Sequence, residues 1–365
     1  MNISLSTLNI YLAKKYFLNF LAVLFFLLLI IYIFDSIELL RRAADRNDIG
    51  LSQALLLSFF KLPEVGQKIF TFSILFSSMI TFWQLSKKHE LVIMRSAGLS
   101  AWQFLIPIIF AAFLIGVFKI TVINPVSVML LKNYDILEAR YFDKRDTPIT
   151  LSDQGLWLKQ ETDNNSAVVH AKKLNVQDWS IELATVFIFD NQNDFQKRID
   201  SPIGYLRNGV WEFRDVIENS PGFLSERSQV FILETPITRE QLEENFSSPE
   251  TVSFWDFPQV IEQLDATGFR SSSLKIYYQV LLSQPLLFIS MVLLAACVSI
   301  KPARMQNSFL LVIIGIGMGF AVFFSSNFLQ ALGASEQIPL FIAAWFPAII
   351  SFLLGIGFLM NYEDG

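Results

Sequence analysis

The sequence predicts a membrane protein with about six transmembrane helices and an all-β domain inserted between the third and the fourth. Hydrophobic residues make up 53% of the 365 positions, and 36 positions are Phe. This is more apolar surface than a soluble fold of this length needs. The charges are uneven, because residues 132–275 hold 15 of the 28 Lys and Arg residues and 24 of the 33 Asp and Glu residues. We therefore expect a charged, soluble domain carried by apolar spans.

Six charge-free apolar runs are long enough to cross a bilayer. A spanning helix needs about 20 mostly apolar residues, because a helix of that length satisfies its own backbone across the hydrocarbon. The first run is too long for the apolar core of a signal peptide and lacks a cleavage pattern, so we expect it to remain as a span. The runs occupy residues 16–34, 69–86, 96–118, 276–300, 305–335 and 338–362.

A further apolar stretch, at residues 51–60, is too short to cross the bilayer. It ends close to Pro63, and a proline there should end a helix. We therefore interpret it as an interfacial or half-inserted helix. The apolar runs and the charges together divide the chain into a first transmembrane half, a β domain and a second transmembrane half, at residues 1–131, 132–270 and 271–365.

The charged middle part has the alternating, β-branched and aromatic pattern of short strands. Asn208-Gly209 is a strong hairpin signal, because a type I′ turn needs positive φ at both central residues. Many short strands with closely spaced turns favour a sandwich or a jelly roll. We expect helices at residues 239–245 and 257–264, and strands near residues 155–159, 167–173, 181–189, 205–213 and 229–233.

The sequence shows no catalytic set. Only two histidines exist, His89 and His170, and the single cysteine, Cys297, lies in an apolar run. These residues form neither a metal-binding cluster nor a nucleophile–base pair. No Gly-Lys dipeptide occurs, which excludes a Walker A phosphate loop. We expect no enzyme activity, metal, cofactor or nucleic-acid partner for this chain, and any ATP that drives it must be hydrolysed by another chain.

The segment at residues 86–98, between the second and third spans, is compact, amphipathic and helix-prone, with a stop at Gly98. Two interpretations remain open. One is a solvated turn whose lysines set the membrane topology. The other is a coupling helix on which Glu90 meets a cationic group of an ATPase, with Arg95 on the same segment, while Leu91 and Met94 fill a groove of that partner.

Three motifs resemble a known family, the lipopolysaccharide export permeases LptF/LptG, and more particularly its LptG side. Glu-Leu-Val-Ile-Met-Arg-Ser-Ala-Gly at residues 90–98 is similar to the coupling helix of that family. Phe-Asp-Ser-Ile-Glu-Leu-Leu-Arg-Arg at residues 34–42 resembles the end of its first span, and Ser-Phe-Trp-Asp-Phe-Pro at residues 253–258 resembles the return towards its fourth. The β domain is similar only in position and size.

The resemblance implies a permease of the inner membrane of a Gram-negative bacterium, with a periplasmic jelly roll between spans three and four. It implies a heterodimer with a homologous, LptF-like permease and a cytoplasmic ABC ATPase dimer that binds the ATP. It also implies a single-span periplasmic jelly-roll protein, LptC-like, and a periplasmic bridge protein. The substrate would be lipopolysaccharide, taken from the outer leaflet. Charge counting alone leaves the membrane orientation open, because the positive-inside bias is weak.

Basic residues near the outer headgroup level are the candidates for binding lipopolysaccharide. Lipid A carries phosphates on an acylated body, so its site should combine an apolar vestibule with cations. Arg41, Arg42 and Lys132 suit that role, and Lys132 resembles a basic position that the family has after the third span. The alternative is that the arginines snorkel to ordinary phospholipids or pair with Glu38 and Asp45.

An apolar slot in the β domain would keep acyl chains out of water once they leave the membrane. We expect inward strand positions such as Val168, Phe187 and Phe189 to line it, or else to form a closed core. Two other functions remain open for the chain. It could be the permease of another ABC-type lipid or lipoprotein exporter, or an integral membrane enzyme that modifies lipids, although the sequence lacks the titratable cluster that such an enzyme needs.

Overall fold

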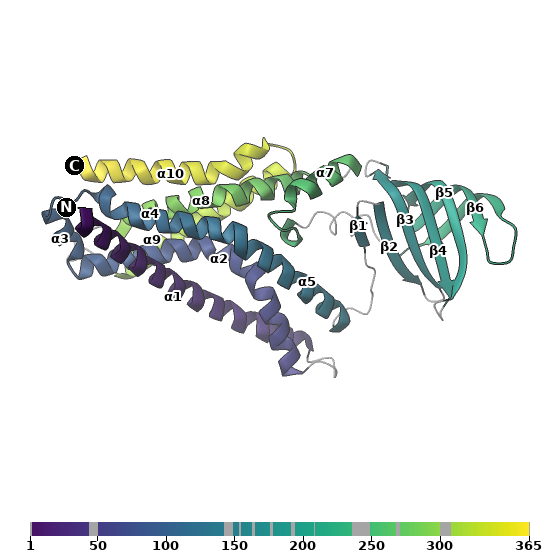
Figure 1. Ribbon diagram of the computed structural model, residues 1–365, viewed down its shortest axis with the longest axis horizontal. Coiled ribbons are helices and arrows are strands. Elements are labelled where there is room, and N and C mark those ends of the chain that lie inside the picture. The colour runs from purple at the N-terminus through teal and green to yellow at the C-terminus, as the bar shows by residue number, and fades with distance from the viewer. Residues whose placement is uncertain are drawn as a thin grey trace. The chain divides into compact units, whose positions relative to one another are not determined.

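The computed structural model divides the chain into two compact units, a helical unit and a unit built on a β-sheet (Figure 1). The helical unit comprises Met1–Tyr134, Ser253–Trp255 and Lys275–Gly365, and the β unit comprises Asp135–Val252 and Asp256–Leu274. The structure describes residues 2–43, 50–141, 149–152, 155–162, 165–175, 178–190, 194–207, 209–235, 249–267, 271–299 and 308–364.

In the described part of the chain, six helices are long and apolar enough to cross a membrane, which confirms the six predicted spans. The third is longer than predicted, because α4 continues through a π-helical turn, Lys119–Ile123, into α5 without a break. A short helix, α3 (Glu90–Ser96), lies between the second and third spans. The remaining bounds are α1 (Asn2–Ala43), α2 (Leu51–Lys87), α4 (Ala101–Phe118), α5 (Asn124–Tyr141), α8 (Ser272–Ser299), α9 (Ser308–Ala334) and α10 (Leu340–Asp364).

The prediction of a separate interfacial or half-inserted helix at residues 51–60 is wrong. These residues form the first turns of α2, which continues through Pro63 to Lys87 and bends along its length (Figure 1). Contacts with α1 support this part of α2. Lys61 forms an ion pair with Asp35 at 3.4 Å, and the Tyr32 hydroxyl donates to the Leu55 carbonyl oxygen at 3.2 Å. Packing between the helices therefore outweighs the local tendency of proline to end a helix.

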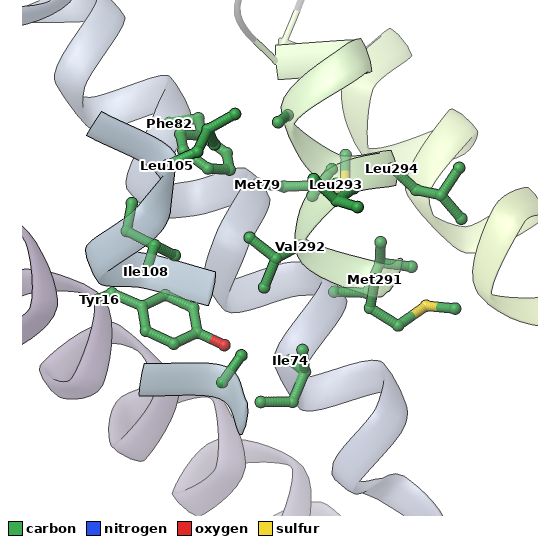
Figure 2. Packing of buried hydrophobic residues seen from close by; sticks show 14 of the residues in the cluster. Tyr16, Ile74, Met79, Phe82, Leu105, Ile108, Met291, Val292, Leu293 and Leu294 are labelled. Carbon is green, nitrogen blue, oxygen red and sulfur yellow. The ribbon is translucent and has the colours of Figure 1, made fainter. Parts of the chain in front are cut away.

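The core of the helical unit lies where α1, α2, α4 and α8 meet (Figure 2). The spans differ greatly in how much of their surface the chain itself covers. In the most apolar stretch of α2, 61% of the residues are buried within the chain. The same share is 6% for α1 and 11% for α9. Apolar side chains along α1 and α9 are therefore left for lipid or for another protein. The core residues labelled in Figure 2 are Tyr16, Ile74, Met79, Phe82, Leu105, Ile108, Met291, Val292, Leu293 and Leu294.

Gly116 allows α4 and α8 to approach closely. A β-carbon at Gly116 would lie 2.8 Å from the Cα atom of Pro285, so the two backbones would have to separate. We expect Gly116→Ala to destabilise the helical unit by about 1–3 kcal/mol, as overpacking does. The measurement is the melting temperature of the purified protein in detergent. Gly317→Ala is the matched control, because no described atom lies within 4 Å of the added carbon. Equal melting of both variants would contradict this packing.

The β unit contains one antiparallel sheet of seven described strands, ordered β1 to β7 as in the sequence. The sequence pattern predicted β2, β3, β4, the β5–β6 hairpin and β7, but missed β1 and most of β5. Helix α7 (Phe257–Thr267) confirms the helix expected at 257–264, while the one expected at 239–245 lies outside the described residues. The strands are β1 (Ile149–Ser152), β2 (Gly155–Thr162), β3 (Asn165–Asn175), β4 (Ser180–Asp190), β5 (Phe195–Arg207), β6 (Val210–Asn219) and β7 (Glu226–Glu234).

The predicted hairpin turn joins β5 and β6. Arg207 pairs with Val210, so the connecting loop has two residues. Gly209 has a φ of 78°, in the left-handed region that glycine adopts without steric cost. Asn208 lies outside the described residues. The tight turn fixes the register of the pair, which brings the buried Trp211 opposite Leu206.

The sheet rolls up on itself instead of forming the two separate layers of a sandwich. Gln160 of β2 donates a hydrogen bond to the carbonyl oxygen of Glu234 at the end of β7, at 2.9 Å. These strands are five places apart in the strand order, so the contact requires a curled sheet. One face of the curled sheet is buried over strands β2 to β6, as at Val169 and Val186, which are paired.

Val168, Phe187 and Phe189 lie on the opposite face of the sheet from this buried set. Val168 pairs with Phe187, and all three side chains are only partly buried. Phe187 and Phe189 contact Phe195 of β5, with ring centroids 6.5 Å and 5.9 Å apart. The prediction that these three residues face inward is therefore wrong, because neighbouring strand positions point to opposite faces. The inward positions are their neighbours, such as Val169, Val186 and Ile188.

Candidate functional site

Helix α3 is held in a sharp connection between the second and third spans. His89, just before it, has a φ of 57°, and Gly98, just after it, has a φ of 84°. The Leu99 amide donates to the Met94 carbonyl oxygen at 3.1 Å, which closes the last turn. Ser100 then caps α4, because its side chain accepts a hydrogen bond from the Gln103 amide. The helix predicted within residues 86–98, with its stop at Gly98, is thus formed.

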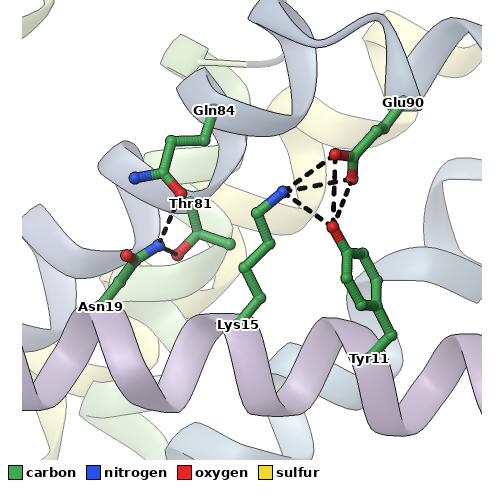
Figure 3. A network of polar contacts seen from close by, with 6 residues as sticks. All are labelled: Tyr11, Lys15, Asn19, Thr81, Gln84 and Glu90. Atoms are coloured by element: carbon green, nitrogen blue, oxygen red, sulfur yellow. Dashed lines mark hydrogen bonds and ion pairs between the residues drawn. The ribbon is translucent and has the colours of Figure 1, made fainter.

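Glu90 lies in a polar network with two residues of α1 (Figure 3). Lys15 Nζ lies 3.2 Å from Glu90 Oε1 and 3.1 Å from Glu90 Oε2. The Tyr11 hydroxyl donates to Glu90 Oε2 at 3.1 Å, and Lys15 Nζ also donates to the Tyr11 oxygen at 3.3 Å. The side chains of Lys15 and Glu90 are 13% and 26% exposed. This ion pair is therefore shielded from water, yet Glu90 keeps an accessible edge.

The apolar side chains of α3 point in two directions. Leu91 and Met94 are buried in the core of the helical unit, where they pack with residues of the neighbouring helices. Val92 and Ile93 are 60% and 64% exposed. The prediction that Leu91 and Met94 fill a partner's groove therefore needs correction, because both side chains are used within this chain. Val92 and Ile93 are the apolar side chains of α3 that a partner can reach.

A second polar contact fastens α1 to α2 one turn further along the helix. The Asn19 amide nitrogen donates to Thr81 Oγ1 at 2.9 Å and to Gln84 Oε1 at 3.2 Å (Figure 3). Asn19 and Lys15 are four residues apart, so they lie on the same face of α1. Lys15 and Asn19 thus join one end of α1 to both α3 and the end of α2.

Arg41 and Arg42, at the other end of α1, both bind Glu38. Arg41 contacts it through Nε and Nη2, at 3.0 Å and 2.9 Å, and Arg42 Nε lies 3.2 Å from Glu38 Oε1. The pairing with Glu38 considered from the sequence is therefore present, while Asp45 lies outside the described residues. Both arginines are exposed, and a guanidinium has five N–H donors, so each can also reach a ligand.

Lys132 is exposed on α5, close in sequence to a point where three helices meet. There Lys61 of α2 pairs with Asp35 of α1 and lies 5.6 Å from the centre of the Tyr134 ring of α5. Arg41 is six residues beyond Asp35, and Lys132 is two residues before Tyr134. The three predicted basic residues therefore lie within about two helical turns of this cluster. The bridging role of Lys61 could not be read from the sequence.

Lys119 is a buried basic residue that the sequence interpretation overlooked. It begins the π-helical turn of the third span and is 3% exposed. Its Nζ lies 5.5 Å and 5.8 Å from the ring centres of Phe70 and Phe288, at distances typical of cation–π contacts. The predicted span ends at Phe118, because Lys119 is the first charged residue after the apolar run. The only signal available was a single lysine within a long apolar context.

The π-helical turn and the first residue of α5 bind the segment that leads back to the fourth span. Asn124 is fully buried, donates to Gln67 Oε1 at 3.3 Å and accepts a hydrogen bond from the Phe254 amide at 2.8 Å. The Trp255 indole N–H donates to the Thr121 carbonyl oxygen at 3.3 Å. The Ser-Phe-Trp motif at residues 253–255 is therefore a docking segment within the helical unit.

The described part of the chain has six apolar spans, a β domain inserted between two sets of three, and a short helix between the second and third spans. This architecture defines a polytopic membrane protein with an inserted soluble domain. The family model described as lipopolysaccharide export system permease LptF/LptG matches residues 10–361, and the chain belongs to this family. Members of the family are inner-membrane transporter permeases rather than enzymes. A comparison with curated proteins finds no match for the chain.

Proposed function

We propose that this chain is the LptG-like permease of an ABC transporter that extracts lipopolysaccharide from the inner membrane of a Gram-negative bacterium. In this proposal the lipid passes to a periplasmic β bridge towards the outer membrane. The observation that carries the mechanism is helix α3, which is anchored by Leu91 and Met94 and exposes Val92 and Ile93. The test is reconstitution in liposomes with the partner permease and ATPase, where ATP should drive lipopolysaccharide onto a periplasmic acceptor. Release without ATP would contradict the proposal.

The proposed partners are an LptF-like permease, a cytoplasmic ATPase dimer, an LptC-like single-span protein and the bridge protein. The exposed apolar surfaces of α1 and α9 support a second permease, because they offer far more uncovered surface than α2 does. ATP would bind only to the ATPase. Extraction exposes acyl chains at a cost of about 0.8 kcal/mol per CH₂ group, so the work must come from such a motor.

We assign the ATPase contact to the exposed side of α3. A cationic group of the motor would bind the accessible edge of Glu90, while Val92 and Ile93 enter an apolar groove beside it and Arg95 lies at the rim. The buried Leu91 and Met94 then connect this surface to the core of α2, α4 and α8. A force on α3 would therefore reach the spans directly through packed side chains.

The double variant Val92→Ser with Ile93→Ser should weaken binding of the ATPase at least about tenfold, because each loses apolar burial in the groove. Pull-down titration of the ATPase onto the purified permease pair measures the effect. Val230→Ser with Ile232→Ser, on the exposed side of β7, is the matched control, since it removes two exposed side chains of the same types elsewhere. Equal binding by both double variants would refute the docking assignment.

The lipid A phosphates would be bound by Arg41, Arg42 and Lys132. The Asp35–Lys61–Tyr134 contacts hold α1, α2 and α5 together close to these residues, which supports a common basic region. Each arginine could exchange its exposed contact with Glu38 for a phosphate, which binds a guanidinium in a bidentate manner. The exposed apolar surface of α1 would face the acyl chains.

Reversing both arginine charges, Arg41→Glu with Arg42→Glu, should reduce lipopolysaccharide crosslinking to the permease at least about fivefold. Two phosphate donors are lost and two repelling carboxylates are added. A photoreactive group on the lipid, with recovery of crosslinked permease as the readout, measures this. Arg41→Lys with Arg42→Lys keeps both charges and should retain most of the crosslinking. Undiminished crosslinking of the reversed variant would contradict the phosphate-binding role of the two arginines.

The β domain would receive the acyl chains on the inward face of its curled sheet. That face is apolar at Val169, Val186 and Ile199, which makes it suited to exclude water from the lipid. Its terminal strands, β1 and β7, each have one edge without a strand neighbour in the described sheet, so they could pair with strands of other jelly-roll proteins. This arrangement would join successive domains into one path.

A further inference from the structure

Tyr11 and Lys15 present two hydrogen-bond donors from one face of α1 to the same carboxylate of α3. They are four residues apart, so one turn of helix aligns them. Their contacts with Glu90 lie between 3.1 and 3.3 Å (Figure 3). The ammonium group of Lys15 also lies 5.3 Å from the centre of the Tyr11 ring. The three side chains therefore form one cluster between α1 and α3, not a single isolated ion pair.

Glu90 can bind residues of α1 and a cationic group of a partner protein at the same time. A carboxylate has about four lone-pair positions, and Lys15 and Tyr11 approach from the α1 side. The Glu90 side chain remains 26% exposed, which leaves room for a further donor. A cation of the motor that binds this exposed edge would therefore pull on a group that α1 already holds.

Helix α1 packs against α2 and α4, but its most apolar part is largely uncovered, so its polar contacts with the other helices help to decide how it moves. Only 6% of the residues in its most apolar stretch are buried within the chain. Its described polar contacts with other helices include Lys15–Glu90 and Asn19–Thr81 near one end and Asp35–Lys61 near the other. An uninterrupted helix joins these two ends. Lys15 and Arg41 are 26 residues apart, which corresponds to about 39 Å along the axis.

We propose that Lys15, assisted by Tyr11, is a positioning residue that makes α1 follow the coupling helix during the transport cycle. This inference rests on the proposed function of α3 and adds a route to the lipid-binding end of the chain. When the motor displaces α3, the shielded ion pair transmits the displacement to α1, and the continuous helix carries it to the region of Arg41 and Arg42. Without the ion pair, the motor would still bind α3 but would move α1 less.

The test uses the complete complex of both permeases and the ATPase in liposomes. Lys15→Met keeps the length of the side chain and removes its charge. We expect this variant to bind the ATPase within about twofold of wild type, but to transport at least about fivefold less lipid per ATP hydrolysed. Lys15→Arg should restore the ratio. Lys14→Met is the matched control, because Lys14 is the adjacent, exposed lysine, and it should behave as wild type.

Two outcomes separate this inference from the proposed function. If Glu90→Ala leaves ATPase binding unchanged, the coupling site itself is wrong. If Glu90→Ala weakens binding while Lys15→Met transports normally per ATP, the coupling site stands and the positioning role of Lys15 is overturned. Should Lys15→Met not fold, Lys15→Gln replaces it, because it also removes the charge of the ion pair but keeps a polar side chain. An unchanged transport ratio in that variant would equally overturn the inference.

Discussion

Replacing Glu90 with lysine should lower the affinity of the permease for its ATPase by at least about a hundredfold. Two effects act in the same direction. The motor's cation loses its carboxylate, and truncating one partner of a shielded charge pair costs about 2–5 kcal/mol. The new ammonium group would also lie beside Lys15, which now contacts Glu90 at 3.1 Å, so α1 and α3 would repel each other. The measurement is recovery of the ATPase with affinity-purified permease at graded ATPase concentrations.

Glu90→Ala and Glu90→Gln should give smaller losses than Glu90→Lys, because they remove the attraction without adding repulsion. Glu182→Lys is the matched control, since Glu182 is an exposed carboxylate on β4 in the other unit. The fold should persist in all four variants, as judged by melting temperature. Complex recovery and transport at wild-type levels after both Glu90→Ala and Glu90→Lys would remove the coupling assignment.

Trp211→Ala should destabilise the β domain by about 3–5 kcal/mol, the usual cost of truncating a buried aromatic side chain. Trp211 is fully buried on β6, and its ring lies 6.3 Å from that of Phe213. Its position in the curled sheet is fixed by the two-residue turn at Gly209. Loss of this side chain would leave a cavity on the face of the sheet that we assign to the acyl chains.

Hydrogen exchange of the full-length protein measures this effect strand by strand. Amides of β5, β6 and β7 should exchange much faster in Trp211→Ala, while those of α2 and α8 should keep their protection. Phe223→Ala is the control in the same domain, because Phe223 is 81% exposed and its truncation should cost under about 0.5 kcal/mol. Equal protection of β6 in both variants would show that Trp211 is not part of the core.

The spans and the hairpin could be predicted from the sequence because their signals are local. A charge-free apolar run of sufficient length allows few structures other than a span. Asn208-Gly209, flanked by Tyr205-Leu206 and Val210-Trp211, similarly favours one type of turn. The error at residues 51–60 arose where a local signal, Pro63, opposed contacts that come from α1, namely Asp35 and Tyr32. Such contacts are set by the tertiary fold, and a single sequence does not reveal them.

Which side of a short helix or strand is buried was harder to predict. In α3, four consecutive apolar residues, Leu91 to Met94, surround the helix, so periodicity could not separate the buried side from the exposed one. In β4, Val186, Phe187, Ile188 and Phe189 are all apolar, so the alternation of polar and apolar residues could not show which of them face the core. The structure resolves both cases through burial. In each, the residues chosen from the sequence lie one position away from those that now fit the proposed role.

Polar partners far apart in the sequence were also beyond the reach of pattern analysis. Lys15 and Glu90 are separated by 75 residues, and Asn124 and Phe254 by 130. The resemblance to the permease family pointed to Glu90, but to neither Lys15 nor Asn124. These contacts require that α1, α3 and the returning segment are already placed by the packing of the spans. They add a mechanical connection to the coupling helix that its sequence motif alone does not contain.

Cysteine crosslinking in native membranes tests the central claim, that a cytoplasmic motor acts on this chain through α3, most directly. Cys297 is the only cysteine, so a Cys297→Ser background allows single reporters to be placed. With a bifunctional thiol reagent, Ile93→Cys on α3 should crosslink to the ATPase, and Phe223→Cys at the exposed tip between β6 and β7 should not. Crosslinking of the ATPase to Phe223→Cys, with none to Ile93→Cys, would contradict both the coupling site and the orientation of the β domain.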